Sequence, residues 1–257
     1  MMDLESSRSE SAGDKDARAD GQDLSSTDNL ELSDEMNESG AEIGHAPTAG
    51  TRNDLGKRVT KRAFDIFGAV LLSILAAPAI LMIAIIIRSS GSPVIFGHER
   101  IGKGRKLFSC YKFRSMNLEA ESDLQELLTV DPKLRVEWEE NHKLRNDPRI
   151  TRFGEFLRKS SLDELPQLWN VIKGEMSLVG PRPVVEDELE RYGRKAPVYC
   201  SVKPGITGLW QISGRSNVTY SRRVSLDALY VRNQTLVLDL WILFCTVKVV
   251  AKRVGAH

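Results

Sequence analysis

The sequence predicts an α/β protein in which a small mixed domain carries one membrane-inserted helix. Two observations support this fold class. Residues 66–87 form a run of 22 residues without a charged side chain, which is long enough to cross a bilayer. Residues 89–235 combine short strand-like segments with longer stretches of helical periodicity, as expected of a mixed domain.

An acidic leader precedes both parts. Residues 1–56 hold 14 acidic and 4 basic side chains and no aromatic residue. Such a stretch buries too little apolar area to offset the entropy lost on ordering, so we expect it to be disordered. The remaining residues hold 32 basic and 21 acidic side chains. That balance suits a phosphate-bearing substrate, an anionic membrane surface or nucleic acid.

Basic residues flank the apolar segment on both sides, and the positive-inside tendency places both flanks in the cytoplasm. Pro78, near its middle, removes a backbone hydrogen bond and favours a kink. A helix that enters the bilayer, bends and returns to the same face reconciles these features, and a plain spanning helix is the alternative. We therefore expect a re-entrant helix hairpin at residues 57–90 and a cytoplasmic domain at residues 91–257. The flanking residues are Lys57, Arg58, Lys61, Arg62, Arg88, Arg100, Lys103, Arg105 and Lys106.

Within the domain, two strands are predicted at residues 94–99 and 106–113, joined by a Gly-Lys-Gly turn at residues 102–104. Residues 119–146 show apolar residues at helical spacing. Pro132 is expected to interrupt this helix.

A second apolar region, residues 236–250, contains Asp239 and Lys248, so its uncharged run is too short to span a bilayer. Trp241 and Phe244 suit an amphipathic helix at the membrane interface, with its aromatic rings at the level of the headgroups. A helix in the core of the domain is the alternative.

The stretch SSLDELPQLWN, residues 160–170, places Asp163 beside Glu164 in otherwise apolar surroundings. Ser161 followed three positions later by Glu164 matches a capping box, which is a purely structural interpretation. The other interpretation is a catalytic pair of carboxylates, and these residues alone do not decide between the two.

Basic residues recur on stiff elements around this pair. Lys112 and Arg114 alternate along a predicted strand and share one face. Arg158 shortly precedes the pair, and Arg182 lies between two prolines that restrict its loop. The segment KPGITGLWQISGR, residues 203–215, offers glycines that let backbone amides approach an anion. Each pattern alone is also typical of a solvated surface or an ordinary turn.

These parts suit attack on a phosphate ester by a carboxylate, which needs an ionised nucleophile and cationic stabilisation of the phosphoryl group. A second carboxylate can hold a divalent ion. With the membrane segment, they indicate phosphoryl transfer at a membrane surface. A hydrolase of lipid phosphates would need the same parts, and a non-catalytic assembly factor is a third possibility.

Several other classes are disfavoured. The sequence contains no Walker loop, no GxGxxG fingerprint and no HExxH motif. Its three cysteines lack CxxC spacing, which argues against a zinc site or a disulfide framework. Nucleic-acid binding is disfavoured because the basic residues are not interleaved with exposed aromatic residues.

Three stretches together resemble the bacterial sugar transferase family, the monotopic polyprenyl-phosphate phosphoglycosyl transferases that begin exopolysaccharide assembly. The resemblance covers roughly residues 57–255 and is strongest to short undecaprenyl-phosphate galactose phosphotransferases. Where many members have Ser-Pro at the bend of the membrane segment, this chain has Ala77-Pro78. The three stretches are KRAFDIFGAVLLSILAAPAILMIAIIIRSSGSPVIFGHERIGKGRKLFSCYKFRSMN, RKSSLDELPQLWNVIKGEMSLVGPRPVVEDELERY and KPGITGLWQISGRSNVTYSRRVSLDALYVRN.

The resemblance implies a membrane-dipping helical hairpin and a small cytoplasmic α/β domain at the inner membrane. The implied reaction moves a sugar-1-phosphate from a UDP-sugar to undecaprenyl phosphate and releases UMP, with Mg²⁺ as cofactor. Galactose-1-phosphate is the first expectation for the transferred group and glucose-1-phosphate the second. Membrane lipids, a second copy of the chain and downstream glycosyltransferases are the further partners expected.

By the same resemblance, Asp163 is the expected nucleophile, which forms a covalent phosphosugar intermediate, and Glu164 is the expected metal ligand. The loop containing Arg182 is expected to shape the site. Arg114 joins the set because it shares the predicted strand face with Lys112. The predicted substrate- and phosphate-binding residues are Lys112, Arg114, Arg158, Pro181, Arg182, Pro183, Asp227 and Tyr230.

Overall fold

A computed structural model describes residues 52–141, 144, 146–214 and 218–251, and the fold is given for these residues. The predicted disordered leader falls almost wholly on residues 1–51, which lie outside the described residues. Its last positions differ from the prediction, because a helix already begins at Arg52.

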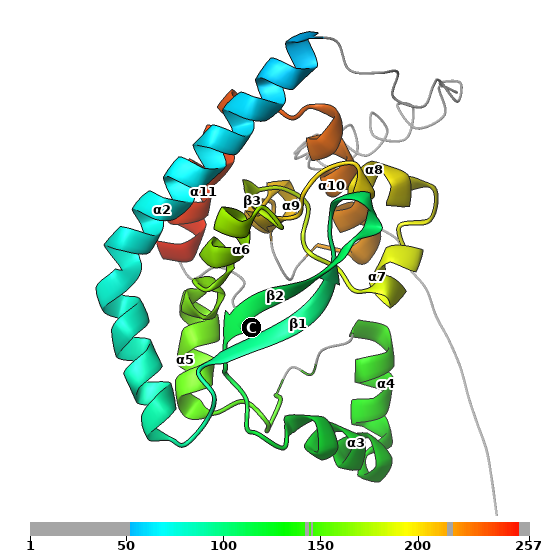
Figure 1. Cartoon of the computed structure of the whole chain (residues 1–257). Helices are drawn as coiled ribbons and strands as arrows, with labels where there is room; N and C mark the ends of the chain where they lie inside the picture. Colours follow the sequence, from blue (N-terminus) through cyan, green and yellow to red (C-terminus); the bar gives the residue numbers. More distant parts are fainter. Residues whose placement is uncertain (1–51, 142–143, 145, 215–217, 252–257) are drawn as a thin grey trace, which may run out of the picture. The chain divides into compact units, whose positions relative to one another are not determined.

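The apolar segment forms α2 (Arg52–Ser89), one helix that runs through Pro78 and changes direction along its length (Figure 1). Its most apolar 18-residue window is only 11% buried, and α2 is long and apolar enough to cross a membrane. A buried core helix is therefore excluded for this segment. The Ser73 hydroxyl donates to the Ala69 carbonyl at 2.7 Å. It therefore does not pair with the Ile74 carbonyl, which Pro78 leaves without its helical donor.

Two small sheets form the domain's β-structure. β1 (Ile95–Ile101) pairs antiparallel with β2 (Leu107–Phe113), and the 3₁₀ turn η1 (Lys103–Arg105) joins them, with Gly104 at φ 69°. This confirms the predicted hairpin. β3 (Ser177–Val179) pairs in parallel with β4 (Gly205–Thr207).

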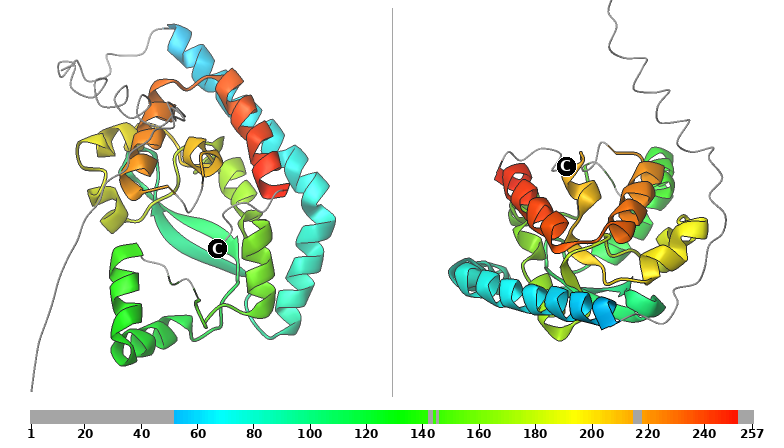
Figure 2. Two further views of the ribbon diagram at one scale, coloured as in Figure 1. Left: turned by 180° about the vertical axis from the view of Figure 1, so that it is seen from behind. Right: turned by 90° about the horizontal axis from the view of Figure 1, so that it is seen from above.

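Helices surround these sheets, which confirms the predicted mixed class (Figures 1 and 2). Pro132 is the first residue of α4, so the predicted break in the long helical stretch is also confirmed. In both figures α2 lies along one side of the domain, with the other elements on its inner side. The remaining elements are α3 (Ala120–Val130), α4 (Pro132–Asn141), α5 (Arg152–Ser160), η2 (Leu162–Glu164), α6 (Gln167–Lys173), α7 (Glu186–Glu190), η3 (Gly193–Lys195), α8 (Ala196–Cys200), α9 (Leu209–Ile212), α10 (Tyr220–Arg232) and α11 (Leu236–Ala251).

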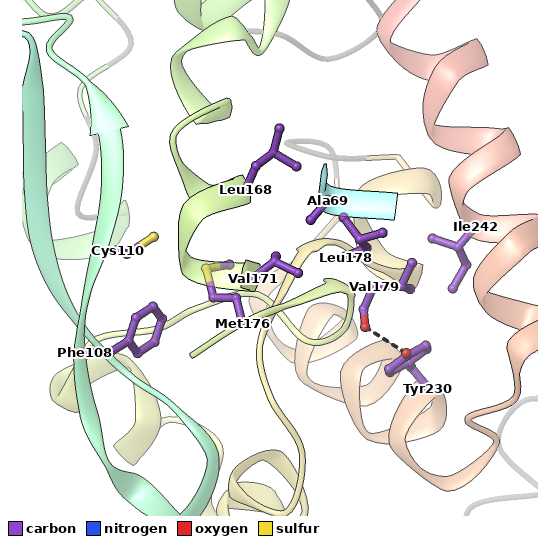
Figure 3. Close-up of a cluster of buried hydrophobic side chains, with 10 residues drawn as sticks. All are labelled: Ala69, Phe108, Cys110, Leu168, Val171, Met176, Leu178, Val179, Tyr230 and Ile242. Atoms are coloured by element: carbon purple, nitrogen blue, oxygen red, sulfur yellow. Dashed lines mark hydrogen bonds between the residues drawn. The ribbon is translucent and has the colours of Figure 1, made fainter. Parts of the chain in front are cut away.

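The largest hydrophobic cluster joins the long apolar helix to the rest of the domain. It draws side chains from α2, β2, α6, β3, α10 and α11 (Figure 3). The same core therefore holds both the β1–β2 hairpin and the apolar helices. Its buried members are Ala69, Phe108, Cys110, Leu168, Val171, Met176, Leu178, Val179, Tyr230 and Ile242.

A buried ionic network reinforces this junction. Lys61 Nζ, on α2, lies 2.8 Å from Asp65 Oδ1 and 3.0 Å from Asp239 Oδ2 on α11. Lys61 also donates to Ser177 Oγ on β3 at 2.7 Å. Asp65 and Asp239 are 2% and 0% exposed, so the charge of Lys61 offsets a large desolvation penalty. Asp239 is thus an anchor inside the fold and not only a polar interruption of α11.

Close backbone packing shapes the loop that carries Arg182. A Cβ atom on Gly205 would lie 2.1 Å from the amide nitrogen of Gly180, and one on Gly208 would lie 2.2 Å from its carbonyl oxygen. These two glycines let β4 press against the start of the loop. Both glycines therefore serve close backbone packing.

Candidate active site

The carboxylate pair lies on a tight turn after α5. Ser161 adopts the left-handed conformation at φ 57° and ends α5, and its N–H bonds to the carbonyls of Arg158 and Leu157. The side chain of Ser161 makes no capping bond to the following turn η2. Ser161 both ends α5 and precedes η2, but the capping-box interpretation is wrong, because its side chain makes no capping bond.

Lys112 bridges the two carboxylates. Its Nζ lies 2.7 Å from Glu164 Oε1 and 3.5 Å from Asp163 Oδ2. Asp163 is 6% exposed, whereas the Glu164 side chain is 36% exposed. The turn thus places one carboxylate inside the protein and the other at its surface, with a cation from β2 between them.

Burial and the neighbouring opposite charges act in opposite directions on the pKa of Asp163 and of Lys112. Burial raises the pKa of the Asp163 carboxyl, and Glu164 adds to that rise, while Lys112 and Arg158 oppose it. For Lys112, burial lowers the pKa, but the Glu164 and Asp163 carboxylates outweigh it and raise the pKa overall. Lys112 therefore stays protonated and supports the charge of the buried carboxylate.

Arg158 is fixed by a close contact between α5 and the segment after β2. A Cβ atom on Gly154 would lie 1.9 Å from the Ser115 carbonyl oxygen, so only glycine permits this approach. Arg158 Nε then donates to Ser115 Oγ at 2.9 Å. Burial lowers the pKa of Arg158, and the charge of Asp163 partly offsets this, so the guanidinium lies within electrostatic reach of the pair.

Asn170 fixes β2 relative to the pair. It is fully buried on α6, and its Nδ2 donates to the Ser109 carbonyl at 2.7 Å. Its Oδ1 accepts from the Tyr111 amide at 3.0 Å. These bonds to two alternate residues of β2 set the position of Lys112, which follows Tyr111 directly.

The loop containing Arg182 approaches from the other side. The charge of Arg182 lowers the pKa of Lys112, as a nearby cation does. Asp227 is 2% exposed and accepts a bond from the Tyr192 hydroxyl at 2.8 Å. Burial raises the pKa of Asp227 to about 7, while Tyr192 and the backbone amide and charge of Arg182 oppose the rise. Asp227 thus supports the Arg182 loop, because it accepts a hydrogen bond from the backbone amide of Arg182.

Two predicted phosphate-binding residues lie elsewhere. β2 ends before Arg114, whose Nε donates to the Pro93 carbonyl at 3.2 Å and whose guanidinium lies over Phe96. In the described residues, Lys112 reaches the pair and Arg114 does not.

Tyr230 is 1% exposed, with its hydroxyl 2.9 Å from the Val179 carbonyl and 2.7 Å from the Asp239 carboxylate (Figure 3). The predicted contact of Tyr230 with phosphate is wrong, because its hydroxyl is used inside the core.

The pair offers ligands for a metal ion of the kind used with phosphates. Among the described residues, no group of three or more His, Cys, Asp or Glu side chains forms a metal cage. Mg²⁺ commonly takes one or two carboxylates and completes its shell with water and substrate phosphates. The carboxylates of Asp163 and Glu164, already arranged around the ammonium of Lys112, fit that requirement.

Two residues that hold the site, Ser115 and Asn170, were not predicted from the sequence. Asn170 stands in the run QLWNVI, and an amide among apolar helical residues is a usable sign of a buried polar contact. Ser115 carries no such sign, because its role depends on the approach of Gly154 from a distant helix.

The chain belongs to the bacterial sugar transferase family, whose sequence profile it matches over residues 56–253. This confirms the family expected from the sequence. The chain is 53% identical to the undecaprenyl-phosphate galactose phosphotransferase of Salmonella typhimurium over 209 residues, and 52% identical to the UDP-galactose-lipid carrier transferase of Erwinia amylovora over 208 residues. Each alignment covers 80% of this chain and 44% of the relative. The exopolysaccharide production protein ExoY of Rhizobium meliloti is 48% identical over 200 residues, which cover 77% of this chain and 88% of ExoY.

Proposed function

We propose that the protein is a phosphoglycosyl transferase that moves galactose-1-phosphate from UDP-galactose to undecaprenyl phosphate and releases UMP. This is the first membrane step of exopolysaccharide synthesis. The observation that carries the proposal is the buried Asp163, held on a tight turn beside Glu164 and bridged to it by Lys112. Support for the substrates comes from the names of the relatives and from the family.

In the first step, Asp163 attacks the phosphorus that carries the sugar. A bond forms between the carboxylate oxygen and phosphorus, and the bond to the UMP phosphate oxygen breaks, with its electron pair leaving on UMP. In the second step, a phosphate oxygen of undecaprenyl phosphate attacks the same phosphorus and Asp163 is released. Lys112 and Arg158, whose charges both act on the Asp163 carboxyl, would neutralise the transferring phosphoryl group.

The two carboxylates divide the work according to their exposure. Asp163 is the buried nucleophile and needs to be ionised, which Lys112 and Arg158 favour against burial. Glu164 is more exposed and is the ligand for Mg²⁺. The metal, when bound, would offset charge on the phosphates of the donor.

The membrane arrangement in this proposal is monotopic. Helix α2 enters the inner membrane, bends at Pro78 and returns to the cytoplasmic face, where the domain meets UDP-galactose. Basic residues at both ends of α2 support this, as does the bend of a helix whose apolar part is largely uncovered. On α11, Trp241 and Phe244 are 52% and 60% exposed, which suits a position at the headgroups.

Release of UMP by the detergent-solubilised protein tests the proposal. With Mg²⁺ and undecaprenyl phosphate, we expect release from UDP-galactose and little from UDP-glucose. Asp163→Asn should abolish it. Asp187→Asn, at an exposed position on α7, is the matched control and should keep full activity.

Other outcomes would assign a different function. Release of inorganic phosphate from the lipid without any nucleotide sugar would indicate a hydrolase. Preference for UDP-glucose would change the donor and leave the reaction class intact. Equal activity of Asp163→Asn and the wild type would remove Asp163 as nucleophile.

A further inference from the structure

Three guanidinium groups gather next to the candidate active site, from β1, the loop after β3, and α10. They belong to Arg100, Arg182 and Arg223, called here the arginine cluster. The guanidinium carbons of Arg182 and Arg223 lie 5.7 Å and 4.9 Å from the ring centroid of Trp210. All three side chains are partly buried.

The cluster carries more positive charge than its neighbours balance. Glu188 lies 3.3 Å from Arg100, but within the described residues neither Arg182 nor Arg223 forms an ion pair. Burial lowers the pKa of Arg100 and of Arg223, and repulsion from Arg182 lowers each further. Partly desolvated like charges are unfavourable unless an anion accompanies them.

A buried donor without a partner lies at the same place. Trp210 is 6% exposed, and its Nε1–H makes no hydrogen bond to any described residue. Trp210, Arg182 and Arg223 line one small cavity together with the carboxyl groups of Glu188 and Asp227. The cavity has room for about one water molecule. The cavity is therefore too small for a phosphate, which would bind at its mouth.

The arginine cluster adjoins the carboxylate pair. Arg100 pairs with Phe108 across the hairpin, and Lys112 lies two alternate positions further along β2, so Arg100 and Lys112 share one face of the β1–β2 hairpin. The cavity lining contains no residue of α2 or α11, the helices with the exposed apolar surface. The cluster thus lies beside the site of phosphoryl transfer. It lies apart from α2 and α11, whose exposed apolar surfaces suit the prenyl chain of the lipid substrate.

We propose that the arginine cluster binds the phosphate of the leaving nucleotide, so that Arg100 and Arg223 are donor-binding residues together with Arg182. This inference rests on the proposed function and adds a subsite to it. Lys112 and Arg158 then serve the phosphate that is transferred, and the cluster serves the phosphate that departs with UMP. Guanidinium groups suit this role because they bind phosphate oxygens through paired N–H bonds.

Calorimetric binding of UMP to the full-length, detergent-solubilised protein tests the subsite. Arg223→Gln should weaken UMP binding about 10- to 100-fold, the effect of losing a charge-assisted hydrogen bond. Arg223→Lys should restore part of the affinity. Arg222→Gln is the matched control, because it removes the same charge from an exposed neighbouring position and should change the affinity less than about twofold.

Two further measurements separate the nucleotide from other phosphates and from a structural role. In transfer assays, Arg223→Gln should raise the KM for the nucleotide sugar and leave that for undecaprenyl phosphate unchanged. An equal rise for both substrates would overturn the proposal, as would UMP affinity unchanged in Arg223→Gln. If Arg223→Lys recovers full thermal stability but only part of the UMP affinity, the guanidinium binds the nucleotide directly, as proposed. A wild-type protein that binds UMP through Arg223 but transfers no sugar would overturn the proposed function and leave the subsite standing.

Discussion

Replacing Asn170 with leucine tests how the active site is held together. Its side chain makes three hydrogen bonds, to the Ser109 carbonyl, the Tyr111 amide and the Glu175 carboxylate. Leucine fills similar space but leaves the two backbone groups of β2 without partners. Each orphaned buried group costs about 1–3 kcal/mol, so we expect a loss of about 2–6 kcal/mol in the free energy of unfolding.

This destabilisation should be visible in a thermal denaturation experiment on the solubilised protein. For a domain of this size, each kcal/mol shifts Tm by roughly 2–4 °C, so the expected fall is roughly 4–24 °C. Asn117→Leu, at an exposed position shortly after β2, is the control and should change Tm little. Activity measured well below Tm should also fall in the Asn170→Leu variant, because Lys112 is no longer held in position. A Tm within 2 °C or so of the wild type would refute the reasoning.

Two further predictions concern packing and pH. Gly154→Ala should destabilise the protein by about 1–3 kcal/mol, because its Cβ would meet the Ser115 carbonyl oxygen at 1.9 Å. The control is Gly56→Ala, at a helical position where a Cβ atom would meet nothing within 4 Å, and it should stabilise the protein by up to about 1 kcal/mol. Equal effects of the two changes on Tm would contradict the close approach of Gly154 to Ser115. Asp227 has a pKa of about 7 in the fold against 3.8 ordinarily, so between these pH values the folded protein holds a proton that the unfolded chain releases. The contribution of Asp227 to the free energy of unfolding is therefore fully present below about pH 4. It falls by up to about 4 kcal/mol as the pH rises to about 7. Denaturation curves of Asp227→Asn should lack this pH dependence.

The elements that local patterns define were predictable. The two strand-like segments and the Gly-Lys-Gly turn between them predicted the hairpin, and Pro132 predicted the break between α3 and α4. The apolar run predicted a helix with an uncovered surface. In each case the determining interactions lie within the segment, so a short window of sequence contains them.

Interactions between distant segments were not predictable. Asp65 and Ser177 are 112 residues apart in the sequence, and Asn170 and Ser109 are 61 apart. Ser161 matched a helix start locally, but its left-handed conformation is set by the end of α5. Tyr230 stood in a family-like motif, yet its hydroxyl is fixed by α11 and β3. No window of sequence shows which partner a polar side chain will find.

The central claim is that Asp163 forms a covalent bond to the transferred phosphosugar. The most direct measurement is the intact mass of the protein after incubation with UDP-galactose and Mg²⁺ in the absence of undecaprenyl phosphate. We expect a mass increase of one hexose phosphate, which digestion locates on the peptide containing Asp163. One UMP should be released per protein, and the adduct should disappear when undecaprenyl phosphate is added. Turnover by the wild type with no adduct at any time, or an adduct that persists in Asp163→Asn, would contradict the central claim.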